Sequence, residues 1–356
     1  MLKSRRSRLD QFFDDYTLDA LLLTSLENIR YLSGFSGSDG VLLLTRDKAW
    51  FLCDSRYATQ AAAEVYDAEI CEFSAKYEAV CSLITDQGIK RFGIEATHML
   101  VSDFRRLSES LKGSEIVGIG ESLDAIRSCK DSLEIELLGR VASLASASLQ
   151  SILASFLKPG ITENDLALEL EIGMRRRGAD ARAFDFIVAS GTRGAMPHGR
   201  ASDKVLRSGE LVTIDFGAVK DGYHSDETVT VAVGRPGERE SEIHEIVKQA
   251  HDRAIAAVRP GMNCRELDAV ARDYIRDRGY GDCFGHGLGH GVGLNIHEKP
   301  VISPRSETVI QEGMVFTIEP GIYIPGFGGV RIEDTVVVTA DGCRVLTQSP
   351  KELLQL

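Results

Sequence analysis

Paired cysteines and net positive charge are both missing from the sequence. The seven cysteines are an odd number, show no Cys-x-x-Cys spacing and are scattered along the chain, so we expect free thiols in a reducing compartment and not a disulfide framework. Lysine and arginine number 41 against 53 aspartates and glutamates, which gives a net charge of −12. Since binding to a phosphate backbone needs a basic surface, this balance argues against a nucleic-acid partner.

Long apolar runs are also missing. No segment approaches the roughly 18 consecutive apolar residues that a membrane span requires. The first residues are basic, but Asp10, Asp14 and Asp15 interrupt them before the apolar core of a signal peptide could form. We therefore expect a cytoplasmic protein without a membrane partner. Its 356 residues, 43% of them hydrophobic, suffice for two domains of ordinary size.

The chain divides into two parts of different character. Over residues 1–126, short apolar runs such as 19–24 and 41–45 alternate with helical stretches, which predicts a mixed α/β domain. Residues 29–40 contain three glycines and three serines and are predicted to form a loop. A long helical pattern follows the first part, and we predict a second domain over residues 127–356.

The second part contains two copies of one pattern. A Lys-Pro-Gly-Ile-Thr segment is echoed by Arg-Pro-Gly-Met-Asn, and Thr162 or Asn263 would cap a new helix with an acid three residues later. The offset between the copies stays between 101 and 107 residues. Several ordered matches at a near-constant offset indicate a duplication, so we predict two homologous α/β halves about a pseudo-two-fold axis. The matching pairs are 158–162 with 259–263, 209–217 with 313–321, and 226–229 with 333–336.

Each copy brings two carboxylates to equivalent places, Asp215 and Asp226 in the first and Glu319 and Glu333 in the second. A single acid in a β-type run is usually a strand-end residue satisfied by a turn amide. Four acids in apolar strand sequence would instead face one another across the axis, and unpaired buried carboxylates are costly, so something cationic must gather there. Two divalent metal ions would balance the four charges. Arginine is the competing solution, and only Arg331 is near these acids in the sequence.

Histidine supplies a nitrogen ligand. Of the eight histidines, His286, His290 and His297 fall within the glycine-rich run 285–298, where small residues let the backbone pass close to a ligand. The run holds neither a phosphate-binding loop motif nor a His-Glu-x-x-His motif. A site of mostly oxygen ligands with one imidazole suits Mn²⁺ or another borderline cation better than a thiolate-rich zinc site does.

These motifs resemble those of the pita-bread metallopeptidases. Gly289–Glu298 reads GHGxGxxxHE, two strand motifs read IDFG and IEPG, and a terminal RIED follows. Within that group the chain is most similar to Xaa-Pro aminopeptidases and Xaa-Pro dipeptidases, because residues 31–40 and 54–61 resemble their N-terminal domain. The resemblance covers nearly the whole chain. It implies an α/β (α+β) fold, with a creatinase-like α/β domain followed by a pita-bread domain of two pseudo-symmetric halves.

The resemblance also implies a dinuclear metal site. Two divalent ions are expected, Mn²⁺ first, with Co²⁺ or Zn²⁺ as alternatives. A hydroxide between the ions would be the nucleophile, and Glu319 would carry its proton to the leaving proline nitrogen. Asp226 and Glu333 would bridge the two ions. The implied metal ligands are Asp215, Asp226, His290, Glu319 and Glu333.

Three further residues match catalytic positions of the family. His198 and His297 would polarise the scissile carbonyl and stabilise the charge that develops on it, and Arg331 matches an arginine near the bridging carboxylates. Each has an alternative role as a supporting polar residue, and His286 is expected to be structural. The chain departs from the family at one place: Val229 stands where the family motif Asp-x-Thr-Arg usually has arginine.

Proteins of this family have several different functions, and the sequence distinguishes some of them better than others. The leading expectation is a Xaa-Pro aminopeptidase, which removes the N-terminal residue from peptides with proline in the second position. The main alternative is a Xaa-Pro dipeptidase, or prolidase, which differs in whether the cleft is open beyond the proline. A non-metal hydrolase of the creatinase type would lack the five-ligand set, and a non-catalytic binding scaffold predicts decayed ligands. A homodimer is expected from the family.

Overall fold

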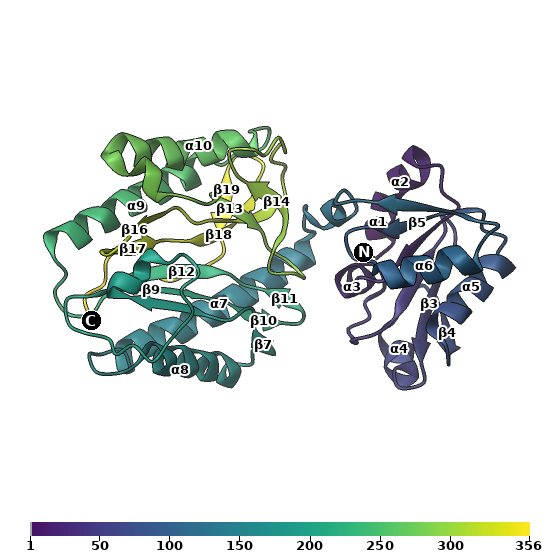
Figure 1. Ribbon diagram of the computed structural model, residues 1–356, viewed down its shortest axis with the longest axis horizontal. Coiled ribbons are helices and arrows are strands. Elements are labelled where there is room, and N and C mark those ends of the chain that lie inside the picture. The colour runs from purple at the N-terminus through teal and green to yellow at the C-terminus, as the bar shows by residue number, and fades with distance from the viewer. Residues whose placement is uncertain (1) are drawn as a thin grey trace. The chain divides into compact units, whose positions relative to one another are not determined.

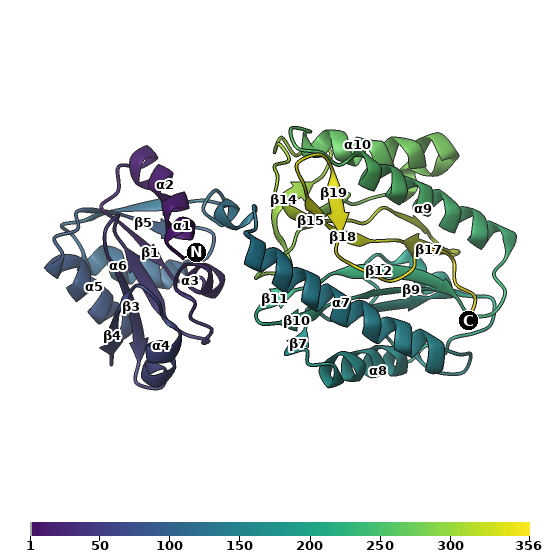
Figure 2. The same cartoon turned by 180° about the vertical axis from the view of Figure 1, so that it is seen from behind.

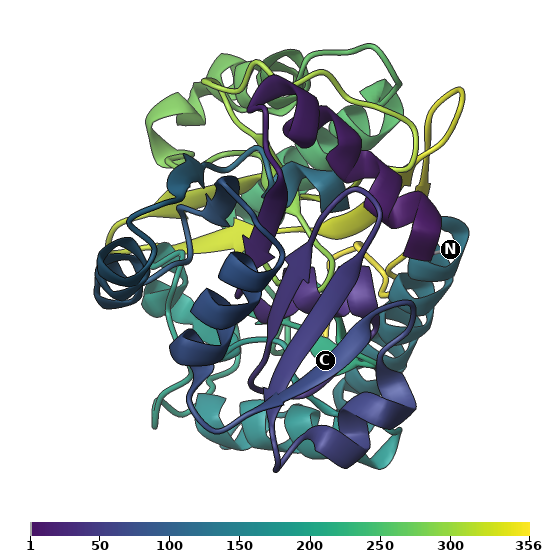
Figure 3. The same ribbon diagram turned by 90° about the vertical axis from the view of Figure 1, so that its right-hand side faces the viewer.

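The computed structural model describes residues 2–356, and the chain separates into two compact units, Met1–Arg127 and Ser128–Leu356. Six strands of the first unit form one sheet in the order β4-β3-β2-β1-β5-β6, and Figure 3 shows them side by side with helices packed around them. The sheet is mixed, since β1 pairs antiparallel with β2 and parallel with β5. Its central strands are apolar and buried because helices and neighbouring loops cover them. The mixed α/β prediction is therefore confirmed.

The elements of this unit follow one another closely. Its strands are β1 (Ala20–Leu23), β2 (Val41–Leu44), β3 (Ala49–Asp54), β4 (Glu69–Phe73), β5 (Arg91–Glu95) and β6 (Glu115–Ile119). Its α-helices are α1 (Leu2–Arg6), α2 (Asp10–Asp15), α3 (Leu26–Ser33), α4 (Ala58–Glu64), α5 (Lys76–Asp86) and α6 (Val101–Ser110).

The loop predicted for residues 29–40 is wrong over its first part, where α3 extends to Ser33. The side chain of Ser25 accepts a hydrogen bond from the amide of Asn28 and caps the start of the helix. Gly34 ends it with φ of 87°, a left-handed conformation that glycine adopts without a steric penalty. These two caps define a helix in a segment whose glycine and serine content alone indicates a loop.

The second unit consists of two halves, as predicted. In the first, α7 and α8 lie along the sheet β12-β9-β8, and in the second, α9 and α10 cover the sheet β14-β13-β15-β18-β19 (Figures 1 and 2). Both expected capping boxes are present, with Thr162 opening α8 and Asn263 opening α10. A separate apolar core fills each half between its helices and its sheet.

The bounds of these elements are as follows. The helices are α7 (Ser132–Ser155), α8 (Glu163–Arg176), α9 (Glu238–Ala257) and α10 (Cys264–Ile275). The strands of the first half are β7 (Ala181–Arg182), β8 (Ile187–Ser190), β9 (Leu211–Phe216), β10 (Ala218–Lys220), β11 (Tyr223–His224) and β12 (Glu227–Ala232). Those of the second half are β13 (Gly289–Gly291), β14 (Glu298–Ile302), β15 (Val315–Ile318), β16 (Gly321–Ile324), β17 (Gly328–Arg331), β18 (Asp334–Val338) and β19 (Cys343–Val345).

Helix α7 is more apolar than the sequence prediction allowed. Its 24 residues are long and apolar enough for a membrane span by length and composition alone. Its buried face, which includes Val141, Ala145 and Leu149, belongs to the apolar core of the first half. The apolar residues of this helix thus contribute to packing within the second unit.

Hydrogen bonds join the two halves where β12 and β18 begin. The amide of Glu333 donates to the carbonyl of Thr228 at 3.1 Å, and the hydroxyl of Thr335 donates to the carbonyl of Asp226 at 2.8 Å. These bonds bring the predicted acidic residues of the two halves to the same place.

Candidate metal centre

Three carboxylates from the two halves form a compact buried cluster. Asp215 lies on β9, Asp226 directly precedes β12, and Glu333 directly precedes β18. One carboxylate oxygen from each lies within 4.8 Å of the others, and all three residues are buried. Equivalent strands of the two halves thus supply acidic residues to one point, as the sequence repeat predicts.

His290 and Glu319 complete this group. His290 on β13 places its Nε2 atom 3.5 Å from Asp226 Oδ2 and 3.5 Å from Glu319 Oε1. Its Nδ1 atom lies 3.0 Å from the carbonyl of Gly291, which can only accept, so Nδ1 carries the proton and the lone pair of Nε2 faces the carboxylates. Thr317 donates to Glu319 Oε1 at 3.1 Å. The structure therefore brings all five predicted ligands together.

Without a bound cation, the charged forms of the carboxylates in this cluster are destabilised. Burial first, and then the neighbouring carboxylates, raise the pKa of Asp226 and of Glu333 well above the usual range. Burial is also the main cause that raises the pKa of Glu319 to about 7. Oxygen Oδ1 of Asp215 is buried and has no hydrogen-bond partner among residues 2–356. A cation at this point would stabilise the ionised acids and occupy that free oxygen.

Arg331 supplies part of the positive charge that the acids need. Its Nη2 donates to Asp215 Oδ2 at 2.7 Å, and its Nη1 donates to the carbonyl of Pro197 at 3.1 Å. Burial would lower the pKa of Arg331, but Tyr323, Asp215 and Glu319 outweigh burial and raise it, so the guanidinium stays charged. One guanidinium balances the charge of one carboxylate. The negative charge of the other three carboxylates would be balanced by divalent cations.

The two predicted catalytic histidines lie at the exposed edge of this group. The ring of His297, just before β14, is centred 4.3 Å from the ring of His290. His198 lies on an exposed loop that follows the 3₁₀ turn η3 (Gly191–Ala195), next to the Pro197 carbonyl that Arg331 contacts. Both histidines are exposed, so they could contact a ligand that enters from solvent. Their catalytic roles remain predictions.

Comparison with known proteins identifies the family. Residues 136–340 match metallopeptidase family M24, and residues 5–129 match the creatinase/prolidase N-terminal domain. The chain belongs to metallopeptidase family M24. It has the pita-bread architecture that the sequence motifs predict.

Relatives of known structure or name cover the chain from end to end. A solved structure of a Xaa-Pro dipeptidase from Bacillus anthracis superposes with a TM-score of 0.97 at 42% identity, over 100% of both chains. A Xaa-Pro dipeptidase of Pyrococcus furiosus is 39% identical over 99% of this chain and 100% of its own. An X-Pro aminopeptidase structure from Thermotoga maritima is 38% identical, with a TM-score of 0.90 over 96% of this chain and 99% of its own.

M24 metallopeptidases use divalent metals, and the residues present here fit that requirement. The fit rests on three observations: a carboxylate cluster within 4.8 Å, a buried oxygen of Asp215 without a partner among the described residues, and an imidazole nitrogen of His290 aimed at the acids. Oxygen ligands with one imidazole are typical of borderline and hard divalent ions.

Sequence analysis missed Tyr323, which connects two predicted residues of this M24 site. Its hydroxyl accepts from Arg331 Nη1 at 2.8 Å and lies 2.9 Å from His286 Nε2. His286 is partly buried, and desolvation lowers its pKa to about 4, so it stays neutral and serves the network as a hydrogen-bonding group. No spacing rule marks a tyrosine on β16, because its role arises only when β16 pairs with β17.

The one departure from the family motif lies outside the site. Val229 is 3% exposed and packs in the apolar core of the first half. Side chains alternate along β12, so Val229 points to the face opposite to Asp226 and Thr228. Valine at this position thus leaves the charge balance of the acidic cluster unchanged.

Proposed function

We propose that this protein is a Xaa-Pro dipeptidase, or prolidase, which hydrolyses dipeptides with a C-terminal proline. The observation that carries the proposal is the end-to-end similarity to Xaa-Pro dipeptidases, together with five gathered residues that can hold metal ions. The sequence motifs alone place the aminopeptidase first and the dipeptidase second. The named relatives support the reverse order.

The proposed metal ligands are the five gathered residues, and two Mn²⁺ ions are the proposed occupants. Divalent ions held in this way supply Lewis-acid chemistry, polarising a carbonyl and lowering the pKa of water. Asp226 and Glu333, which lie at the junction of the two halves, would hold the ions together with the other three residues. The ligands are Asp215, Asp226, His290, Glu319 and Glu333.

The protein's own groups move the proton and hold the substrate. Glu319 is proposed to accept a proton from water and deliver it to the proline nitrogen, a general acid–base role for a carboxyl that lies beside His290 in the cluster. His198 and His297 are proposed to donate hydrogen bonds to the carbonyl oxygen as it gains charge. Arg331 holds Asp215 in place through its 2.7 Å hydrogen bond.

A Xaa-Pro aminopeptidase is the second candidate function. The X-Pro aminopeptidase structure from Thermotoga maritima supports it, since that chain shares 38% identity over nearly its whole length. Both enzymes would cleave before proline with the same centre. They differ in whether a residue beyond the proline is accepted.

Paired substrates separate the two candidates. The purified protein with Mn²⁺ is given an Xaa-Pro dipeptide and the matching Xaa-Pro-Xaa tripeptide, and the released N-terminal residue is measured. Cleavage confined to the dipeptide supports the dipeptidase. Efficient cleavage of the tripeptide replaces it by the aminopeptidase, and cleavage of neither rejects proline specificity.

We also propose a homodimer working in the cytoplasm. The cytoplasmic location is supported by the cysteines, all seven of which are free thiols, as expected in a reducing compartment. The dimer rests on the family resemblance alone, and sedimentation of the purified protein tests it.

A further inference from the structure

Two buried carboxylates lie on the strand faces turned away from the proposed metal centre. Glu227 follows Asp226, and Asp334 follows Glu333. Because successive strand side chains point to opposite faces, Glu227 and Asp334 are directed away from the centre. Their side chains are only 1% and 8% exposed. Two charges buried at equivalent places of the two halves need a common positive partner.

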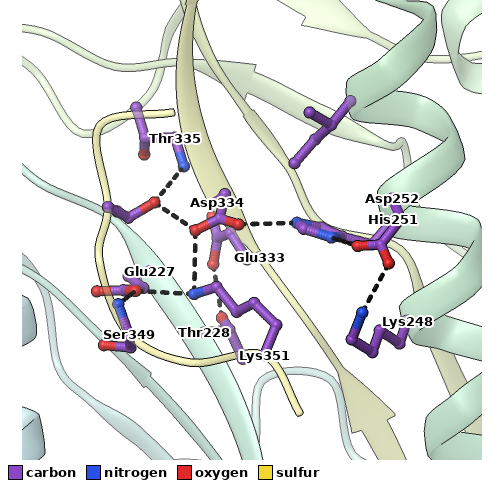
Figure 4. A network of polar contacts seen from close by, with 12 residues as sticks. Glu227, Thr228, Lys248, His251, Asp252, Glu333, Asp334, Thr335, Ser349 and Lys351 are labelled. Carbon is purple, nitrogen blue, oxygen red and sulfur yellow. Dashed lines mark hydrogen bonds and ion pairs between the residues drawn. The ribbon is translucent and has the colours of Figure 1, made fainter. Parts of the chain in front are cut away.

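That partner is Lys351, near the C-terminal end of the sequence. Its Nζ lies 2.7 Å from Glu227 Oε1 and 3.1 Å from Asp334 Oδ1, and its side chain is 9% exposed (Figure 4). Burial alone would lower the pKa of Lys351, but the two carboxylates outweigh burial and raise it. The ammonium is therefore charged, and it joins the first strand residue of β12 to the first strand residue of β18.

The C-terminal segment adds further bonds around this ammonium. The amide of Ser349 donates to Glu227 Oε1 at 2.9 Å (Figure 4). The hydroxyl of Thr347 donates to Asp334 Oδ1. The segment thus contacts both carboxylates with three different groups. Each half also holds its own acid, through Ser146 on α7 for Glu227 and through His251 on α9 for Asp334.

We propose that Lys351 is a positioning residue for the metal centre. Glu227 directly follows Asp226, and Asp334 directly follows Glu333. By holding Glu227 and Asp334, the ammonium therefore also fixes the distance between Asp226 and Glu333, the two acids that face the metal site. The hydroxyl of Thr228 holds Glu333 from the other side at 2.6 Å. This inference rests on the metal centre proposed above and adds a residue from outside the five ligands.

Binding of Co²⁺ alone to metal-free protein tests the inference without measuring turnover. The visible absorption of bound Co²⁺ gives the dissociation constant and reports ligand geometry. For Lys351→Met we expect about 10- to 100-fold weaker binding, the range typical of residues that orient metal ligands. Lys351→Arg keeps the charge and is expected to restore most of the affinity. Wild-type affinity in Lys351→Met overturns the inference.

Two further variants separate positioning from simple charge balance. Lys220→Met is the matched control, because it removes an ammonium from an ion pair with Asp180 that lies outside the network around Lys351, and it is expected to bind Co²⁺ as wild type does. The double variant Lys351→Met/Glu227→Gln removes one buried charge of each sign, while Asp334 keeps its contacts with Thr347 and His251. Weak Co²⁺ binding in the double variant supports positioning, and wild-type affinity there overturns it. A wild-type protein that binds no Co²⁺ rejects the metal centre itself.

Discussion

Arg331 and Asp215 are 116 residues apart in the sequence and are joined by a hydrogen bond of 2.7 Å between Nη2 and Oδ2. The bond crosses from the second half to the first and uses one oxygen of Asp215. The other oxygen, Oδ1, has no partner within the described chain. A buried carboxylate that is satisfied on one side only indicates that its second ligand is not a protein group, which is the physical basis for a cation here.

Replacing Asp226 by alanine is expected to abolish metal binding and activity together. Asp226 belongs to the carboxylate cluster and lies 3.5 Å from His290 Nε2, so its loss would remove a ligand from the middle of the proposed site. The loss should exceed the roughly 10- to 100-fold effects of supporting residues. Metal content by elemental analysis and turnover of an Xaa-Pro dipeptide measure it. Asp273→Ala removes an exposed acid of the same unit and serves as the control, and turnover retained in metal-replete Asp226→Ala would break the proposed mechanism.

Much of this site could be predicted because the chain repeats itself. The repeat identified four acids at equivalent strand positions, and GHGxGxxxHE marked His290 and His297. Tyr323 and Lys351 could not be found in that way. Tyr323 acts through Arg331, which it meets only because β16 pairs with β17, and Lys351 acts through Glu227, which is 124 residues away in the sequence. A lysine among polar C-terminal residues shows no pattern from which burial could be read.

The fold was predictable where short sequence motifs determine the local structure by themselves. The capping boxes at Thr162 and Asn263 were visible as short motifs and are present. Helix α3 was not predicted, because its composition indicates a loop and its definition depends on Ser25 and Gly34 at its two ends.

Two neighbouring histidines should respond differently to replacement by alanine. His290→Ala is expected to lose metal, because its Nε2 lies 3.5 Å from two proposed ligands. His297→Ala is expected to keep metal and lose about 10²- to 10³-fold in kcat, the usual effect of removing one donor to a developing oxyanion. Metal content and steady-state kinetics on the same preparations distinguish the two. Metal loss in His297→Ala would make it a ligand.

Stability of the metal-free protein should depend on pH through Glu319. Its pKa rises from 4.5 to about 7 on folding, so the folded state binds the proton more tightly than the unfolded state does. Its contribution to stability is present below about pH 4.5 and is lost as the pH rises through 7. Since buried histidines titrate in the opposite sense, the measurement is a difference: denaturant unfolding of wild type against Glu319→Gln at pH 5 and pH 8, without metal. We expect wild type to lose stability relative to the variant as the pH rises, and a constant difference would refute the assignment.

Glu163 should control the loop that carries His198. Its side chain is fully buried, accepts from the amide and hydroxyl of Ser190 and from Ser202 at 2.7–2.8 Å, and pairs with Arg193. Glu163→Ala is expected to cost about 3 kcal/mol in the free energy of unfolding, the low end for a broken buried pair because Arg193 is 25% exposed. Urea unfolding measures this value.

The same variant should affect catalysis through the loop and not through the metal. With loss of Glu163, kcat/KM should fall while metal content stays at the wild-type level. Glu171→Ala, which removes a partly exposed carboxylate of the same helix that pairs with Arg175 and Arg182, is the control. Equal kinetics in Glu163→Ala and Glu171→Ala would show that the loop is held by other contacts.

The most direct test of the account is metal removal and restoration with one substrate. The protein is treated with EDTA, freed of chelator and assayed for cleavage of an Xaa-Pro dipeptide before and after Mn²⁺ is added. The account predicts that activity disappears with the metal and returns with Mn²⁺, and that Asp226→Ala does not recover. Full activity in protein shown by elemental analysis to be free of metal would contradict it.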